Sequence, residues 1–255
     1  MTLPPNTTPA IPAATLVILR DVPGRAPDLL MVERARSMAF AGGAMVFPGG
    51  RVDPGDHALA AVIGDADDDG AARVAAIRET LEEVGLAIGL SPPPSPAMTR
   101  RLRAGLHAGQ AFGGLLAQEG LTIDPTVMVP FARWCPAHRM SRIFDTRFYL
   151  AQLPDGSVPA KVDGTENARL VWLTAATALA EAAAGRMTLI YPTRRNLERL
   201  AQFGSFAAAV ADAGAYPVIT IIPYIERRGD IDHLCIPTEL GYPVTAEPIG
   251  QAVRG

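Results

Sequence analysis

Cysteine is scarce in this chain, which contains only Cys135 and Cys235. Two cysteines cannot build the framework of disulfides that stabilises many small secreted domains. Each is better explained as a buried thiol than as a reactive group, because unpaired cysteine behaves mainly as a small apolar residue. The sequence therefore predicts a protein of the reducing cytoplasm.

Long apolar runs and an excess of positive charge are missing as well. No stretch is apolar and long enough to cross a bilayer, and none resembles a cleavable secretory signal. The net charge is −3, whereas proteins that coat nucleic acid carry a basic surface. Residues 251–255 contain no peroxisomal address. We therefore expect a small-molecule partner, with neither a membrane nor a nucleic acid involved.

Signs of nucleophilic catalysis are also absent. The G-x-S-x-G sequence that carries the serine of many hydrolases does not occur. The histidines are scattered, without the spacing of metal ligands: His57, His107, His138 and His233. Each is more readily explained as a surface or hydrogen-bonded side chain. These absences argue against a serine hydrolase.

One predicted helix carries an acidic face, and this is the most informative feature present. Successive residues of an α-helix are rotated by about 100°, so Glu79, Glu82 and Glu83 share one side of a helix over residues 75–86. A solvated surface is one explanation. The other is a site for a divalent cation such as Mg²⁺, which prefers carboxylate ligands and relieves the repulsion of like charges four residues apart. The opposite side is apolar, with Val74, Ile77, Leu81 and Val84.

The segment before this helix favours the cation site. Residues 44–47 predict a strand, and Pro48, Gly49 and Gly50 predict a tight turn at its end. Glycine at such a turn lets backbone carbonyl groups approach a ligand or metal closely. Asp56 adds another acid shortly afterwards.

Together these residues resemble the Nudix box, G-x5-E-x7-R-E-U-x-E-E-x-G-U, in which U is aliphatic. Gly50 begins the match, and residues 78–86 contain an intact R-E-x-x-E-E-x-G-U half. Asp56 stands where glutamate is usual, and Thr80 stands where an aliphatic residue is usual. The segment between Asp56 and Arg78 has 21 residues, 14 more than the usual motif.

A long insertion at this point resembles one Nudix branch, the peroxisomal acyl-coenzyme A diphosphatases. That branch has an F-x-x-G-x-x-V-F-P-G-G entry, which residues 40–50 resemble. The similarity extends over about residues 13–243. Its further elements are residues 144–151, 166–174, 192–197 and 236–242.

The resemblance implies an α/β fold of Nudix type, an α/β/α sandwich with a curved mixed sheet and extra helical insertions. Periodicity alone indicates only a mixture of helices and strands. We expect a mobile lead-in at residues 1–12, a single domain over 13–243 and a tail at 244–255. Insertions are expected at about 57–74 and 92–120, with a solvated loop at 64–70. The other predicted strands are 13–20, 28–33, 127–134, 145–153 and 218–224, and the other helices 98–118, 174–184 and 193–210.

The resemblance also implies metal-dependent hydrolysis of a nucleoside-diphosphate-linked substrate. The implied Mg²⁺ or Mn²⁺ ligands are Glu79, Glu82, Glu83, a carbonyl group of Gly49 or Gly50, and Asp56 as an occasional or supporting ligand. Arg78 is the residue expected to orient the carboxylates, and together with the three glutamates it forms the predicted catalytic set. Glu79 and the more distant Glu166 are the candidates for the general base.

Coenzyme A or acyl-coenzyme A is the best-fitting substrate, and cleavage would release 3′,5′-ADP and (acyl-)phosphopantetheine. Phe47, Gly49, Arg34 and Arg51 are the predicted substrate contacts. A 3′-phosphate favours arginine, and the candidates are Arg34, Arg36, Arg51, Arg139, Arg142, Arg147, Arg194 and Arg195. The bacterial coenzyme A signature fits only in part, because Ala39 replaces its second arginine.

Three alternatives remain open at this stage. The substrate could be ADP-ribose, NADH or a dinucleoside polyphosphate. The chain could be a catalytically silent module that binds a nucleotide and regulates a partner, although a pure binder has no need of clustered acids. It could also be an unrelated hydrolase that uses nucleophilic catalysis. Separately from these alternatives, the resemblance implies a homodimer, since enzymes of this family and size often form one.

Overall fold

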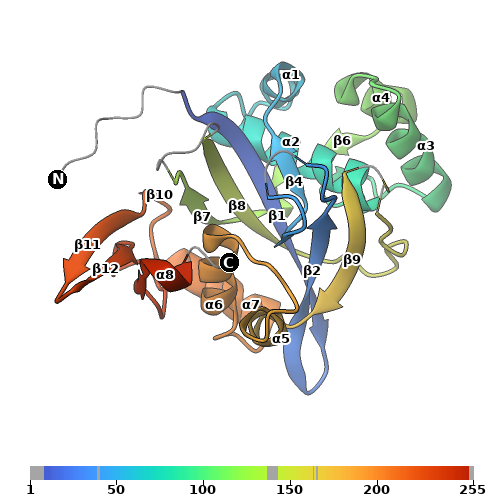
Figure 1. Cartoon of the computed structure of the whole chain (residues 1–255). Coiled ribbons are helices and arrows are strands. Elements are labelled where there is room, and N and C mark those ends of the chain that lie inside the picture. Colours follow the sequence, from blue (N-terminus) through green and yellow to red (C-terminus); the bar gives the residue numbers. More distant parts are fainter. Residues whose placement is uncertain (1–8, 39–40, 137–142, 163, 165, 253–255) are drawn as a thin grey trace.

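The computed structural model describes residues 9–38, 41–136, 143–162, 164 and 166–252 (Figure 1). Some residues named above lie outside these ranges: Ala39, Phe40, His138, Arg139 and Arg142. Residues 1–8 of the predicted lead-in and 253–255 of the predicted tail also lie outside them.

A mixed sheet forms the centre of the described fold. Its middle strand, β1 (Ile11–Val22), is antiparallel to β2 (Arg25–Arg34) and parallel to β8 (Phe144–Gln152). The strand order is β10-β7-β8-β1-β2-β3, with β4 paired to β1 and β9 paired to β2. Strands β1 and β2 confirm the predicted strands 13–20 and 28–33, and they pair as a hairpin. The remaining strands are β3 (Met45–Val46), β4 (Gly49–Arg51), β7 (Val129–Trp134), β9 (Asn167–Leu173) and β10 (Thr220–Ile221).

Helices cover both faces of this sheet (Figure 1). Side chains of β1 alternate between two cores, as successive residues of a strand must: Leu16 and Ile18 enter one core, and Val17 and Leu19 enter the other. The first, here called the α2-side core, packs α1 (Pro54–Val62), α2 (Asp68–Val84), α3 (Pro96–His107) and α4 (Phe112–Glu119). The second, the α6-side core, packs α5 (Ala175–Ala183), α6 (Tyr191–Leu200) and α7 (Phe206–Ala215). This three-layer arrangement confirms the predicted α/β/α sandwich.

The predicted acidic helix is longer than expected at its N-terminus. Asp67 accepts hydrogen bonds from the backbone amides of Asp69 and Gly70, at 2.9 and 2.8 Å, and so caps α2. Acids in a first turn are also favourable, because the N-terminal end of a helix is partly positive. The prediction of a solvated loop over residues 64–70 is therefore wrong from Asp68 onward. At the other end Gly85 adopts a φ of 71°, which ends the helix.

Several other boundaries differ from the prediction. The expected helices 98–118 and 193–210 are each divided, because Gly109 with a φ of 74° separates α3 from α4, and Ser205 starts α7 with a new side-chain cap. Gly49 and Gly50 lie in strand β4 rather than in a tight turn, since they pair with Thr15 and Ala14 of β1. Strand β1 begins at Ile11, inside the expected lead-in.

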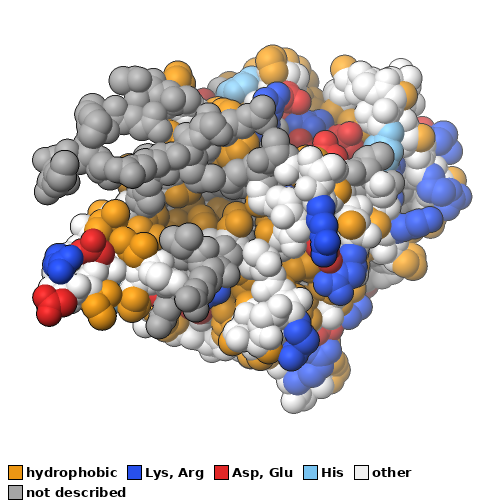
Figure 2. Space-filling view, in the orientation of Figure 1, with side chains coloured by type: hydrophobic (Ala, Val, Ile, Leu, Met, Phe, Trp, Pro, Cys, Tyr) orange, Lys and Arg blue, Asp and Glu red, His pale blue; other side chains and the backbone are white. Residues whose placement is uncertain are grey.

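A small separate sheet was not predicted. It consists of β11 (Tyr224–Arg228), β12 (Ile231–Cys235) and β13 (Ala246–Pro248), and it takes up part of the expected tail. The predicted strand 218–224 is divided between β10 and β11. Strands β11 and β12 form a projecting hairpin, and hydrophobic side chains are exposed on it (Figure 2). The other short elements are β5 (Leu90–Ser91), β6 (Thr122–Ile123), the 3₁₀ turn Pro125–Val127 and α8 (Ile249–Ala252).

No helix among the described residues has the length and apolar character needed to span a membrane.

Thr80, which stands where the family motif has an aliphatic residue, provides a test of packing. Its side chain is fully buried in α2, and its hydroxyl group has no hydrogen-bond partner. Thr80→Val keeps the shape and removes a desolvated polar group, so we expect the free energy of unfolding to rise by about 1 kcal/mol.

Urea denaturation measures this change, with Thr99→Val as the matched control. The Thr99 hydroxyl is also buried but donates to the Ser95 carbonyl at 3.1 Å, so the control should not gain stability. A Thr80→Val protein no more stable than the parent would contradict the assignment.

Candidate active site

Arg78 lies at the centre of the acidic face of α2. Its Nε and Nη2 atoms donate to the two carboxylate oxygens of Asp56, each at 2.9 Å. Its Nη2 also donates to the Arg51 carbonyl at 3.0 Å, and its Nη1 donates to Glu79 Oε1 at 2.9 Å. Glu82 Oε2 lies 3.7 Å from the same Nη1 atom. The guanidinium group therefore contacts carboxylates on both sides, in the planar forked geometry that arginine favours.

Asp56 acts through Arg78 in this structure. The residue is 2% exposed, and its Oδ2 also accepts from the Asp53 backbone amide at 2.8 Å, at the start of α1. Because both carboxylate oxygens already accept strong hydrogen bonds, the geometry favours the supporting role of Asp56 over direct ligation of a metal. A shorter side chain than glutamate suits that role, since α1 brings it directly to the guanidinium group.

Glu79 faces the strand that carries the glycine pair. A Cβ atom added to Gly50 would lie 2.5 Å from the Glu79 carboxylate carbon, so a larger residue at position 50 would displace this carboxylate. Burial raises the pKa of Glu79 to about 7, and the neighbouring charge of Glu82 adds to this rise, while Arg78 opposes it.

Glu83 is the most enclosed of the three glutamates, at 4% exposure. The Gly49 amide donates to its Oε2 at 3.0 Å, and the Asn167 side chain also favours the charged form of this carboxylate. Burial nevertheless raises the pKa of Glu83 to about 8, helped by the charge of Glu79, while Arg34 favours the charged form.

The donor set fits a divalent cation. No three carboxylate, imidazole or thiol groups of the described residues already converge as a metal cage. Glu79 and Glu83 are nevertheless buried acids whose charged forms are disfavoured, and Glu82 is one third exposed and can rotate. A hard cation would supply the positive charge that these oxygens lack.

Phe47 does not fit its predicted role. Its side chain is 2% exposed and packs in the α6-side core, so it presents no surface to a ligand. Arg51 keeps an exposed side chain next to the site, and its carbonyl group holds Arg78. Glu166 is exposed just before β9, where its carbonyl accepts from the Ala35 amide at 2.7 Å.

Two arginines proposed for a substrate phosphate lie on the wrong face of the sheet. Arg194 and Arg195 belong to α6, and both form ion pairs with Glu247, at 3.3 and 3.1 Å. Arg195 is also 2.8 Å from Glu198 and is almost fully buried. These ion pairs stabilise the layer on the other side of the sheet from α2, which disfavours both arginines as candidates for a substrate phosphate. Arg147 lies 3.6 Å from Asp69 near the start of α2.

Asn167 is a site residue that the sequence analysis missed. It begins β9, is fully buried, and its side chain favours the charged form of Glu83. In the sequence, the only signal for Asn167 is its position directly after the predicted Glu166. Its place in the site follows from the pairing of β9 with β2, which sets Asn167 opposite Arg34.

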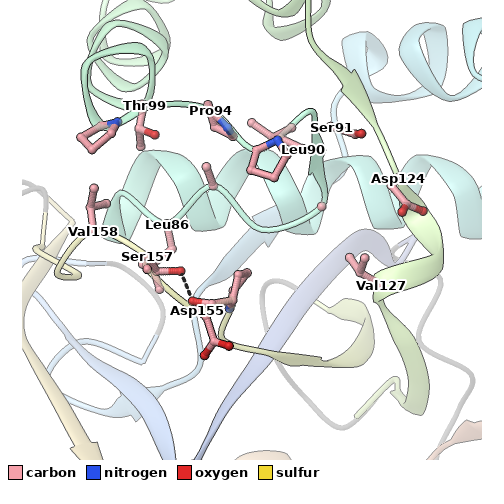
Figure 3. A pocket seen from close by; sticks show the side chains of 16 residues that line it. Leu86, Leu90, Ser91, Pro94, Thr99, Asp124, Val127, Asp155, Ser157 and Val158 are labelled. Atoms are coloured by element: carbon pink, nitrogen blue, oxygen red, sulfur yellow. Dashed lines mark hydrogen bonds between the residues drawn. The ribbon is translucent and has the colours of Figure 1, made fainter.

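A separate cavity lies beyond the end of α2 (Figure 3). It has a volume of about 330 Å³, and its lining includes Leu86, Leu90, Thr99, Asp124 and Asp155. None of the three glutamates lines it, so this cavity is distinct from the acidic site.

Comparisons with known proteins agree with this geometry. The family described as the NUDIX domain matches residues 10–192. The crystal structure of a NUDIX hydrolase from Alicyclobacillus acidocaldarius is 29% identical, with a TM-score of 0.71, covering 81% of this chain and 97% of that chain.

Two further structures resemble the chain more loosely. The NUDIX domain of Shewanella oneidensis NrtR complexed with ADP ribose is 13% identical, with a TM-score of 0.43, covering 76% of this chain and 88% of that chain. A C. elegans Ap4A hydrolase is 19% identical, with a TM-score of 0.39, covering 68% of this chain and 87% of that chain. These superpositions are too loose to support an inference about substrate.

The buried glutamates predict how stability depends on pH without metal. Their folded-state pKa values, about 7 for Glu79 and about 8 for Glu83, lie above the usual value near 4.5. The folded state therefore holds more protons than the unfolded state, and stability should fall as pH rises from about 5 to about 8. Thermal unfolding in EDTA measures this trend.

Glu83→Gln is the matched variant for this measurement. It removes one of the titrating groups, so its melting temperature should depend less on pH over the same range. A parent protein whose metal-free stability is flat or rises from about pH 5 to about pH 8 would contradict the assignment.

Proposed function

The chain belongs to the Nudix family and is a Nudix hydrolase of nucleoside-diphosphate-linked substrates, and from that premise we propose that it cleaves coenzyme A or acyl-coenzyme A with Mg²⁺ or Mn²⁺. The products would be 3′,5′-ADP and (acyl-)phosphopantetheine. The observation that carries the proposal is the set of buried carboxylates on α2, held by Arg78 and by the Gly49 amide.

Glu79, Glu82 and Glu83 are the residues proposed to hold the metal, with a carbonyl group of Gly50. When bound, a divalent cation neutralises phosphate charge and lowers the pKa of a coordinated water. Most of the remaining catalytic effect is positioning and charge stabilisation.

The side chains of the chain have distinct proposed tasks around that centre. Arg78 fixes the Glu79 carboxylate, while Gly49 fixes that of Glu83 and Asn167 favours its charged form. Water attacks one phosphorus, the bond to the bridging oxygen breaks, and the second phosphate leaves with the electron pair. Glu79, in place of its role as a metal ligand, is the first candidate to accept the proton of the attacking water through a carboxylate oxygen. Glu166, exposed before β9, is the second candidate for this base.

The proposed substrate is supported by the sequence resemblance, whereas the proposed reaction is supported by the carboxylates on α2. The long segment between Asp56 and Arg78 and the residues 41–50 resemble the acyl-coenzyme A branch, and this resemblance favours coenzyme A. Arg34, whose charge acts on Glu83, and Arg51, whose carbonyl group accepts from Arg78, are the proposed phosphate contacts. ADP-ribose, NADH and dinucleoside polyphosphates are the alternative substrates. A silent binding module is disfavoured, because buried acids on α2 are costly without a cation.

Homodimer formation is a further proposal. Large apolar side chains are exposed along the projecting hairpin and its flanks (Figure 2): Ile219, Ile222, Tyr224, Ile225 and Ile231. Exposed apolar groups of this kind favour contact with another protein surface, and light scattering would measure the mass in solution.

Replacing the proposed ligands should remove activity without removing the fold. For Glu82→Gln and Glu83→Gln we expect turnover to fall by roughly 100-fold or more, as when other charged groups of active sites are lost. Product release is measured at saturating Mg²⁺, and circular dichroism checks folding. Glu181→Gln on α5 is the control, since Glu181 pairs with Arg186 in the opposite layer. A double Glu82→Gln, Glu83→Gln protein with the parent rate would contradict the ligand assignment.

Product analysis tests the substrate. Purified protein is incubated with coenzyme A, an acyl-coenzyme A, ADP-ribose, NADH and a dinucleoside polyphosphate, first with Mg²⁺ and then with Mn²⁺. Release of 3′,5′-ADP from the coenzyme A substrates alone is the expected result. Turnover of ADP-ribose, NADH or the dinucleoside polyphosphate instead would refute the coenzyme A assignment but would still support metal-dependent hydrolysis of a diphosphate.

A further inference from the structure

We propose that the helical insertion α3 sets the metal affinity of the site, because Arg103 fixes the last turn of α2 and with it Glu82 and Glu83. The proposal rests on the proposed function only in taking these two glutamates as metal ligands. It assigns Arg103 as a positioning residue, since its contacts are with the backbone of α2.

The carbonyl groups at the end of α2 provide the first argument. The last four carbonyl groups of a helix lack partners within the helix and need them from elsewhere. The Leu81 carbonyl accepts from the Gly85 amide at 3.0 Å, and the Val84 carbonyl accepts from the Lys161 amide at 2.9 Å. The carbonyl groups between them belong to the two proposed ligands, and both accept from α3.

Arg103 spans those two carbonyl groups. Its Nε donates to the Glu82 carbonyl at 2.9 Å, and its Nη2 donates to the Glu83 carbonyl at 2.8 Å. His107 Nε2 lies 3.0 Å from the same Glu82 carbonyl. A Cβ atom at position 85 would come within 3.0 Å of Arg103 Nη1, so Gly85 leaves the space that the guanidinium group occupies.

The contact links a rigid support to the proposed ligands. Leu102 and Leu106 of α3 are buried in the α2-side core, so the helix that presents Arg103 is itself held in place. A cation at the end of a helix is favoured by the negative charge of the carbonyl groups there. One planar group bonded to two consecutive carbonyl groups restrains the rotation of that turn, and the direction of both glutamate side chains follows from it. Supporting contacts of this kind commonly change metal affinity 10–100-fold.

Mn²⁺ binding to the substrate-free protein tests the proposal, with the free ion followed by electron paramagnetic resonance. We expect Arg103→Met to weaken binding by about 10-fold. Arg103→Lys should be intermediate, because an ammonium group cannot bond both carbonyl groups in the same fork. Arg101→Met is the matched control: Arg101 lies on the same helix but forms a bidentate ion pair with Glu119 of α4, at 2.7 Å.

Hydrogen exchange of the backbone amides in the last turn of α2 is the second readout, and it needs no metal. Arg103→Met should speed exchange there, whereas Arg101→Met should not. Unchanged Mn²⁺ affinity in folded Arg103→Met, or an equal loss in Arg101→Met, would overturn the proposal.

Parent protein that binds no Mn²⁺ would refute the ligand assignment of the proposed function, and the inference with it. Faster exchange in Arg103→Met under that outcome would show that Arg103 holds the helix without serving a metal site. The two failures are therefore distinguishable.

Discussion

The burial of several carboxylates on one face of α2 is the constraint on which the rest of the site depends. Negative charge removed from water must be compensated by hydrogen bonds and nearby positive charge. Arg78 supplies part of this compensation to Glu79, while the Gly49 amide and Asn167 supply part of it to Glu83. The raised pKa values show that the compensation is incomplete in the protein alone. A divalent cation would compensate the remaining negative charge of these carboxylates.

The surrounding fold is arranged around that charge. Strand β4 brings Gly50 close to the Glu79 carboxylate, and it packs Gly49 so tightly against the backbone of Ala14 and Thr15 in β1 that a side chain has no room there. Helix α1, which begins at Pro54 and continues into the expected insertion, places Asp56 behind Arg78. Helix α3, from the second insertion, reaches the last turn of α2 through Arg103. The second insertion thus contacts α2, although it does not belong to the short motif that identifies the family.

Differences between the sequence prediction and the structure share a physical origin. Alternation and periodicity located β1, β2 and α2, because each has a continuous apolar pattern over its length. Helices α3 and α4 share one pattern that runs past Gly109, so the division between them was not predicted. Phe47 directly precedes the Pro48, Gly49 and Gly50 motif in sequence, but its side chain packs in the α6-side core. Arg194 and Arg195 were plausible phosphate ligands only while the layer containing α6 was unknown.

The sequence by itself determined the class of chemistry. The spacing of Glu79, Glu82 and Glu83 on a helix, with Arg78 beside them and glycines upstream, is local information that any fold would preserve. Only the tertiary structure decided that Asp56 supports Arg78, that Asn167 favours the charged form of Glu83 and that Arg103 bonds the end of α2. These contacts join segments that are 20 or more residues apart. They depend on strand register and layer packing, which local spacing along the chain does not specify.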